Sequence, residues 1–395
     1  MQAQPLTRGL TWMLATASGV AVANIYYNQP MLADIGREFH ATARHAGLVA
    51  TLTQVGYAAG MPAFIPLGDF VDRRRLVVML FGAVACGLVA AALATSLTSL
   101  IVASFLIGAT TVIAQIIIPL ATELAPPAEQ GRTIGAILTG VLLGILLART
   151  LSGFVAEHFG WRAMFWVAAA GAVAFGAMLH FRLPSLHPHA ALTYSELMRS
   201  MWQLVRGIPK LRQVSLVAGL FFASFTAFWT TLVFFLQTPP YHYGAQAAGL
   251  FGLVGATGAA VAGISGRLAD TRGPRFVISI ALAIVLAAYA VFWSLGVYLW
   301  GLVLGVVLLD VGVQSAQVAN QTRVLGLKPE ARNRVNTVYM ICYFSGGSLG
   351  SALGTWAWSH WQWPGLCATG ILLMLMATVL FLSRGPDPVA GRSDR

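Results

Sequence analysis

Twelve apolar runs separated by short polar segments make up most of the chain. They lie near residues 10–32, 46–67, 76–95, 100–124, 133–156, 163–181, 213–236, 247–265, 276–295, 299–325, 335–357 and 365–383. About 20 apolar residues in a helix cross a hydrocarbon core of ~30 Å, whereas a membrane barrel would show short strands of alternating polarity. The pattern therefore predicts an all-α integral membrane protein with twelve transmembrane helices.

A polar stretch at 182–212 divides the runs into two groups of six. The second group repeats the first: HFGW at 158–161 corresponds to HWQW at 360–363, and the same offset of 202 relates Gln115 to Gln317. Repeated six-helix units joined by a hinge loop are typical of two bundles that rock about a central site. We predict an N-terminal six-helix bundle (1–181), a cytoplasmic central loop (182–212) and a C-terminal six-helix bundle with a short cytoplasmic tail (213–395).

The composition agrees with burial in a lipid bilayer. Hydrophobic residues make up 57% of the chain, charged residues 9%, and the mean hydropathy is +0.75. The net charge of +11 comes from arginines dispersed between apolar runs, not from a basic helix with interleaved aromatics, which argues against nucleic-acid binding. Histidines and cysteines form no cluster with metal-ligand spacing, so we expect no metal and no other cofactor.

The distribution of basic residues predicts the orientation in the membrane. The N-terminus, the even-numbered connections and the tail hold most of the arginines and lysines, whereas the other side has only Arg37, Arg44 and Arg162. Cytoplasmic loops carry the excess of positive charge. Both termini are therefore expected on the cytoplasmic side.

Two short charged loops occupy corresponding places in the two halves, PLGDFVDRRRL at 66–76 and GRLADTRGPR at 266–275. The second matches the pattern Gly-x-Leu-Ala-Asp-x-x-Gly-x-Arg, and the first keeps Gly68, Asp72 and the arginines but not Leu-Ala. This loop resembles the signature of the major facilitator superfamily, and the resemblance covers essentially the whole chain. On NIYYNQP, GWR and LDVGVQSAQVANQ, the chain looks most like the bacterial drug and sugar efflux (drug:proton antiporter) branch.

The resemblance implies a secondary transporter of the cell inner membrane that works by alternating access, and it implies a cytoplasmic gate at the two loops. Glycines are expected to form tight turns, an aspartate to begin the next helix, and arginines to bridge to the facing half. The expected gate residues are Gly68, Asp72, Arg73, Arg74, Arg75, Gly266, Asp270, Arg272, Gly273 and Arg275. Two family features of proton-linked exporters are missing, since Ile145 follows Gly144 where a proline is expected and no Lys or Arg occurs between 76 and 131.

Two charges lie inside the apolar runs, Arg149 in the fifth and Asp310 in the tenth. A charge in hydrocarbon costs ~2.5–3.5 kcal/mol on insertion scales, so each needs a reason to be there. One hypothesis makes Asp310 a proton-coupling carboxylate whose pKa is set by burial and by Arg149. The other is a static ion pair, or separate backbone contacts, holding the halves together.

Uncharged polar and aromatic residues on several helices are candidates for a substrate cavity. They could bind a neutral, hydroxylated or aromatic solute by hydrogen bonding and stacking, or they could be interhelical hydrogen bonds. On the tenth helix, residues 314, 317 and 321 share one face, which favours the cavity. The candidates are Asn24, Tyr27, Asn28, Gln54, Tyr57, Gln115, Trp229, Gln314, Gln317, Gln321, Tyr339 and Tyr343.

These features favour a transporter over an enzyme or an ATP-driven pump, because neither a catalytic motif nor a nucleotide-binding P-loop is found in the sequence. We predict a monomeric secondary transporter that moves a small organic solute, by efflux in exchange for protons. Proton-coupled uptake of a small neutral or aromatic solute is the alternative. The expected partners are the solute, protons and the lipid bilayer.

Overall fold

The structure is a computed structural model that describes residues 7–126, 129–184 and 193–383. All regular elements in these ranges are helices. The first half contains α1 (Arg8–Ala23), η1 (Gln29–Met31), α2 (Leu32–Glu38), α3 (Ala43–Phe64), η2 (Pro66–Asp69), α4 (Arg73–Ala92), α5 (Leu97–Thr110), α6 (Ile113–Leu124), α7 (Gln130–Phe159) and α8 (Trp161–Arg182). The second contains α10 (Pro209–Leu236), α11 (Ala245–Arg272), α12 (Pro274–Leu295), α13 (Leu299–Leu325), η4 (Pro329–Ala331) and α14 (Arg332–Leu382).

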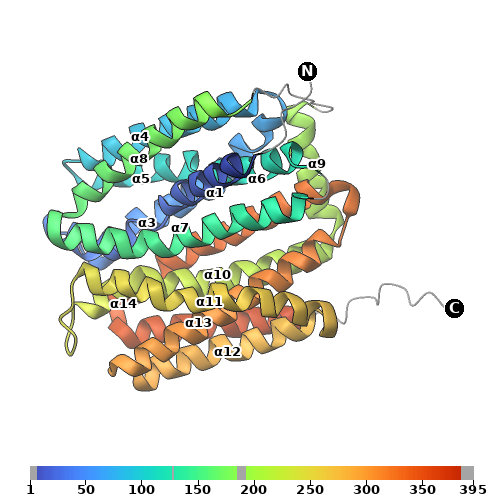
Figure 1. The fold of residues 1–395 in the computed structure, drawn as a ribbon. Helices are drawn as coiled ribbons and strands as arrows, with labels where there is room; N and C mark the ends of the chain where they lie inside the picture. Colours follow the sequence, from blue (N-terminus) through green and yellow to red (C-terminus); the bar gives the residue numbers. More distant parts are fainter. Residues whose placement is uncertain (1–6, 127–128, 185–192, 384–395) are drawn as a thin grey trace.

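Between the halves, α9 (Tyr194–Gly207) forms within the segment predicted as a loop. Thr193 and Glu196 form a capping box that begins this helix. Figure 1 shows the two bundles one above the other, with α9 running between them at one end. We call this the α9 end of the molecule and the opposite one the far end.

The prediction of twelve spans is confirmed once two irregularities are taken into account. Ten helical segments are long and apolar enough to cross a membrane within the described residues, and one of them, Leu97–Leu124, consists of α5 and α6 together. The first span is additional: α1 ends where the Asn24 amide bonds to the carbonyls of Val20 and Ala21, and the chain continues through η1. α14 contains two spans, because Gln362 breaks its helical backbone with φ 53° and ψ −142°.

The two halves meet along two seams, α3 against α14 and α7 against α11. Glycines allow the close approach. A Cβ on Gly47 would lie 2.4 Å from the Thr355 side chain, and one on Gly153 would lie 2.5 Å from the Ala245 carbonyl oxygen. Helix association in lipid depends on such close packing, because no hydrophobic gain is available between helices.

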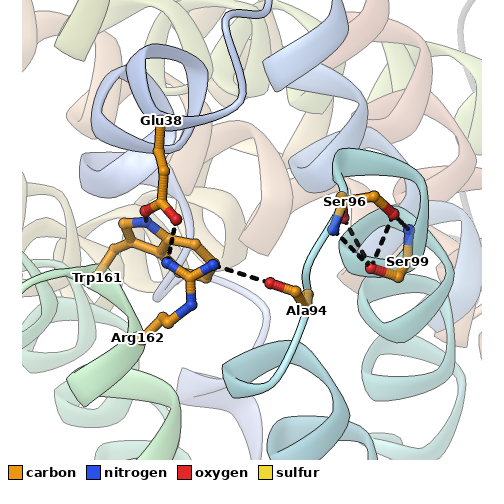
Figure 2. Close-up of polar contacts among 6 residues, drawn as sticks. All are labelled: Glu38, Ala94, Ser96, Ser99, Trp161 and Arg162. Carbon is orange, nitrogen blue, oxygen red and sulfur yellow. Dashed lines mark hydrogen bonds and ion pairs between the residues drawn. The ribbon is translucent and has the colours of Figure 1, made fainter.

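At the far end, a polar network ties α2 and α8 to the connection between α4 and α5 (Figure 2). The Trp161 indole donates to Glu38 over 2.6 Å, Arg162 forms an ion pair with Glu38, and Arg162 also donates to the Ala94 carbonyl over 2.8 Å. The guanidinium of Arg162 lies 4.1 Å from the Trp161 ring centroid, a cation–π contact. The GWR motif thus closes the first bundle at the far end.

Acid is expected to weaken this network. Burial acts to raise the pKa of Glu38, but the hydrogen bonds from Arg162 and Trp161 and the charge of Arg162 outweigh it and hold the pKa below its usual 4.5. A carboxyl with a lowered folded-state pKa contributes stability above its unfolded pKa and loses it as pH falls through the folded value. The thermal unfolding temperature of the purified protein should therefore fall more steeply below pH 4.5 than that of Glu38→Gln. The loss in the free energy of unfolding that this carboxyl causes should be less than about 1 kcal/mol, because the Glu38 side chain is 43% exposed. Parallel pH profiles of the unfolding temperature would contradict this assignment.

Candidate functional site

A cavity of ≈ 990 Å³ lies between the two halves. Its blind end is formed by buried aromatic residues, among them Tyr26, Phe222 and Phe225. Its mouth is at the α9 end, where the lining residues Glu123, Arg332 and Asn333 are exposed. The cavity volume is in the range of a site for a small organic molecule.

Aromatic rings from both halves form the inner part of the cavity. Tyr343 stacks on Phe222 with ring centroids 4.1 Å apart, and Tyr57 packs against Phe344 at 4.4 Å. Amides lie beside these rings: Gln115 donates to the Tyr57 hydroxyl over 3.4 Å, and the Tyr343 hydroxyl donates to the Gln317 carbonyl oxygen over 3.1 Å. Such a lining can stack against a flat apolar group and hydrogen-bond to its edge.

Half of the predicted cavity residues line this space. On α13 the residues 314, 317 and 321 line it together, as expected for one helix face. The lining members of the predicted set are Tyr57, Gln115, Gln314, Gln317, Gln321 and Tyr343.

The other predicted cavity residues are buried between helices. Asn24 caps α1, and the Asn28 amide donates to the Thr53 hydroxyl over 2.9 Å, so both have the interhelical or local hydrogen bonds that were the alternative interpretation. Trp229 packs under Arg149. Those outside the cavity lining are Asn24, Tyr27, Asn28, Gln54, Trp229 and Tyr339.

Several lining residues were not predicted from the sequence. Phe222 and Phe344 lie in apolar runs where nothing distinguishes them from lipid-facing or core aromatics. Polar residues at the start of α14 also line the mouth, namely Arg332, Asn333, Arg334 and Asn336. Arg332 and Arg334 were counted only among the basic residues that set the orientation, and Asn333 and Asn336 were given no role.

Arg149 and Asp310 lie buried beyond the blind end, 1% and 3% exposed. Arg149 Nε donates to Gln29 Oε1 over 2.8 Å, and the guanidinium lies 4.0 Å from the centroid of the Trp229 ring. It also faces the rings of Tyr26 and Phe225 at 5.0 and 5.5 Å. An aromatic cage of this kind stabilises a desolvated cation.

Asp310 also lies near Trp229. A Cβ on Gly255 of α11 would lie 2.9 Å from Asp310 Oδ1 and 3.2 Å from Trp229 Cζ2. Arg149 and Asp310, both in the described ranges, form no ion pair within 4.0 Å. In these ranges Arg149 Nη2, Trp229 Nε1 and Asp310 Oδ2 also have no hydrogen-bond partner. The direct ion pair of the static hypothesis is therefore not formed in this conformation.

The far end of the cavity is sealed by contacts that cross between the halves. The Thr51 hydroxyl of α3 donates to the Ser351 hydroxyl of α14 over 3.0 Å. On the other seam, the backbone N–H of Gln246 in the first turn of α11 donates to the Glu157 carboxylate over 3.4 Å. Because the N-cap residue Gly244 has no side chain, Glu157 supplies the capping carboxylate from the other half.

The first charged loop has part of the predicted geometry. Asp72 begins α4 and accepts hydrogen bonds from the backbone N–H groups of Arg74 and Arg75, over 2.8 and 3.4 Å. Arg73 forms an ion pair with Glu123 at 2.6 Å and donates to the Gly68 carbonyl, so these contacts lie within its own half. Gly68 lies in η2 without a positive φ.

The second charged loop differs from its predicted geometry. Gly266 and Asp270 were expected at the turn and at the start of the next helix, but both lie inside α11, which continues to Arg272. The turn is made by Gly273, whose φ of 87° favours glycine, and Gly273 is the N-cap of α12. Arg272 and Arg275 lie over the rings of Phe276 and Phe381 in their own half.

Comparison with known proteins identifies the family. The profile of the Major Facilitator Superfamily matches residues 14–351. The chain is 38% identical over 371 residues to a protein named "Uncharacterized transporter YgaY" from Escherichia coli O157:H7, with 94% of each chain covered. It is 33% identical to "Probable transporter SCO4007" of Streptomyces coelicolor, covering 90% of this chain and 83% of that protein.

Solved structures agree on the fold. A bacterial homologue of the human lysosomal transporter Spinster, in an inward-facing and unoccupied conformation, superposes with a TM-score of 0.75 at 16% identity, covering 95% and 96% of the two chains. The nucleoside transporter NupG gives a TM-score of 0.76 at 12% identity, covering 94% and 98%. With its twelve spans and the match to nearly its whole length, this chain belongs to the Major Facilitator Superfamily of transporters.

Proposed function

We propose that this transporter exports a small neutral or aromatic organic solute across the inner membrane in exchange for protons. The observation that carries the proposal is the cavity between the halves, which is sealed at one end and has two buried ionisable groups directly behind its aromatic blind end. Alternating access requires a central site that one set of seals separates from one side of the membrane.

The α9 end is proposed to face the cytoplasm. It contains Arg332 and the arginines at 73–75, together with the basic residues of α9, whereas the far end has Arg37, Arg44 and Arg162. The positive-inside rule then orients the molecule. In this orientation the cavity is open to the cytoplasm, the state in which an exporter loads its solute.

Asp310 is proposed to carry the coupling proton. Its carboxylate lies beside Gly255 of α11 and near Trp229, the residue whose ring faces Arg149. When the halves rock, the distance from Arg149 and the access of water must both change, and these two quantities determine whether a buried carboxyl holds a proton. The same ring cluster, through Tyr26 and Phe225, also borders the cavity.

Proton-coupled uptake is the second candidate function. It is favoured by the absence of a basic residue between 76 and 131 and by Ile145 in place of the proline after Gly144, since both depart from the pattern of proton-linked exporters.

Everted membrane vesicles distinguish these candidates. Respiration acidifies the vesicle interior, a pH-sensitive dye reports the gradient, and aromatic amides, sugars and amino acids are added one at a time. Export by antiport predicts that a transported solute collapses the gradient and accumulates inside. Uptake by symport predicts no collapse when solute is added outside, because solute and proton move in the same direction; collapse should occur only in vesicles preloaded with the solute, from which both leave together. A gradient that survives every compound, with no solute flux in reconstituted liposomes, contradicts both candidates.

A further inference from the structure

A second, smaller cavity of ≈ 240 Å³ lies at the α9 end, beside the mouth of the cavity between the halves, which we call the central cavity. One wall is the second half of α9, and the other is the connection between α13 and α14. We call this smaller cavity the α9 pocket. Pockets for drug-sized molecules begin at roughly 300 Å³, so the α9 pocket suits a smaller group. The described lining residues are Ser200, Gln203, Leu204, Gly207, Ile208, Lys328, Ala331 and Arg334.

Both charged residues of this lining are cations, Lys328 and Arg334. Within the described part of the chain, neither side chain has an ion-pair or hydrogen-bond partner. Gln203 adds an amide that can donate a hydrogen bond, and Leu204 and Ala331, 7% and 4% exposed, form an apolar base. Two unpartnered cations and an amide around one small space are a donor set that suits a phosphate group.

The face of α9 that points away from the central cavity is basic and aromatic. Leu197 and Met201 line the central cavity. At about 3.6 residues per turn, Arg199, Trp202 and Arg206 lie on the opposite face of the helix. Trp202 is 55% exposed, and the Arg206 guanidinium lies 4.8 Å from its ring centroid. An exposed tryptophan with basic neighbours is typical of a helix at the membrane–water interface.

α9 lies at the level of the lipid headgroups. Figure 1 shows it running across the end of the molecule, whereas the spans run along its length. Only Ile208 separates α9 from α10, whose 28 residues make a helix of about 42 Å. A bilayer with its headgroups is ~40–45 Å thick, so the start of α10 lies in the headgroup region. The end of α9 that lines the α9 pocket must therefore lie there too.

We infer that the α9 pocket binds the phosphate group of an anionic phospholipid, whose acyl chains lie in the leaflet on the α9 side. Lys328 and Arg334 pair with the phosphate, and Arg199 and Arg206 on the exposed face attract the neighbouring headgroups. A soluble phosphate would satisfy the two pocket cations but would leave the exposed Trp202 unexplained. A lipid accounts for both features, because tryptophan anchors a helix at the headgroup level.

The site connects the lipid to the mouth of the central cavity, because Arg334 lines both spaces. A phosphate in the α9 pocket would hold Arg334 there and so remove a cation from the mouth. α9 is also attached to the first half, where the Tyr194 hydroxyl donates to the Pro62 carbonyl over 2.9 Å. A bound lipid would thus join α9, fixed to α3 at one end, to the start of α14 in the second half.

Native mass spectrometry of the detergent-purified full-length chain tests the site without any measurement of transport. The protein is titrated with dioleoylphosphatidylglycerol, and zwitterionic dioleoylphosphatidylcholine is the lipid control. Lys328→Gln and Arg334→Gln each remove one pocket cation. Arg332→Gln is the matched control, because Arg332 is an exposed cation two residues from Arg334 that does not line the α9 pocket.

One molecule of phosphatidylglycerol should bind more tightly than any further ones. Its Kd should rise about fivefold in Lys328→Gln and in Arg334→Gln, as expected for the loss of one basic residue that faces an anionic headgroup, and should stay unchanged in Arg332→Gln. Gln203→Glu should weaken binding from the α9 side, because it places a carboxylate beside the phosphate. This variant keeps the test decisive if a variant of the α13–α14 connection does not fold. Phosphatidylcholine should bind more weakly and equally to all variants.

Equal losses in Arg332→Gln and the pocket variants would mean that net charge alone attracts the lipid, and would overturn the inference. Unchanged binding in Lys328→Gln, Arg334→Gln and Gln203→Glu would overturn it as well. A competition with inorganic phosphate distinguishes the two sources of the phosphate group. Displacement of the bound lipid by inorganic phosphate at equal concentration would assign the pocket to a soluble anion and overturn the lipid site. None of these outcomes bears on solute export, which the vesicle experiment tests separately.

Discussion

Asp310→Asn is expected to reduce pH-driven transport to the level of vesicles without the protein, while the amount of protein in the membrane stays unchanged. Asparagine fills nearly the same volume beside Gly255 and Trp229, so the packing of α11 on α13 should survive. It cannot take up or release a proton, so a coupled carrier would lose its driving reaction. Solute-driven dye collapse in everted vesicles, normalised to protein measured by immunoblot, gives the result.

Two control variants separate this role from a structural one. Asp310→Glu keeps a titratable carboxyl and should retain part of the activity. If Asp310 only neutralises Arg149, then Asp310→Asn should lower the protein level, because it leaves a buried cation unpaired, and Arg149→Gln in the same chain should restore it. If the double variant reaches the normal protein level but still does not transport, Asp310 has a coupling role beyond neutralising Arg149. If the double variant transports normally, that coupling role is contradicted.

The fold could be predicted because the bilayer imposes a simple requirement. Every backbone polar group in hydrocarbon must be satisfied within a helix, so apolar length alone indicates the spans. The break of α14 at Gln362 lies in the gap predicted between the spans at 335–357 and 365–383, two residues before Pro364. The turn of the second charged loop was not predicted correctly, because it was expected at Gly266 and occurs seven residues later at Gly273. Both glycines match the family loop, and only the position at which α11 stops distinguishes them.

The cavity was predictable only where polarity contrasts with the surrounding sequence. On α13 the glutamines at 314, 317 and 321 stand out against apolar neighbours, and their spacing fixes the face they share. Tyr339 and Trp229 were assigned to the cavity but are buried elsewhere. The sequence of a helix that is apolar on all faces does not show which of its faces points towards the cavity. Phe222, which does line the cavity, was missed for the same reason.

A disulfide between Thr51→Cys and Ser351→Cys is expected to abolish transport completely, and a reducing agent should restore it. The two hydroxyls are 3.0 Å apart on α3 and α14, so cysteines at these positions are close enough to cross-link when the far end is closed. Alternating access requires this contact to separate in every cycle, because the solute must leave through the far end. The measurement is transport in liposomes before and after oxidation, in a background without Cys86, Cys342 and Cys367.

The control is a cross-link of the same length that does not join the halves. Ser265 and Ser315 have hydroxyls 2.7 Å apart on α11 and α13, both within the second half, so cysteines there should cross-link without stopping transport. Inhibition by both disulfides would indicate that α11 must move against α13, so that the halves would not rock as rigid bundles. Full transport with the Thr51–Ser351 pair oxidised would mean that the far end never opens along the α3–α14 seam. The solute would then need an exit between α7 and α11, where the Glu157 carboxylate of α7 caps the start of α11.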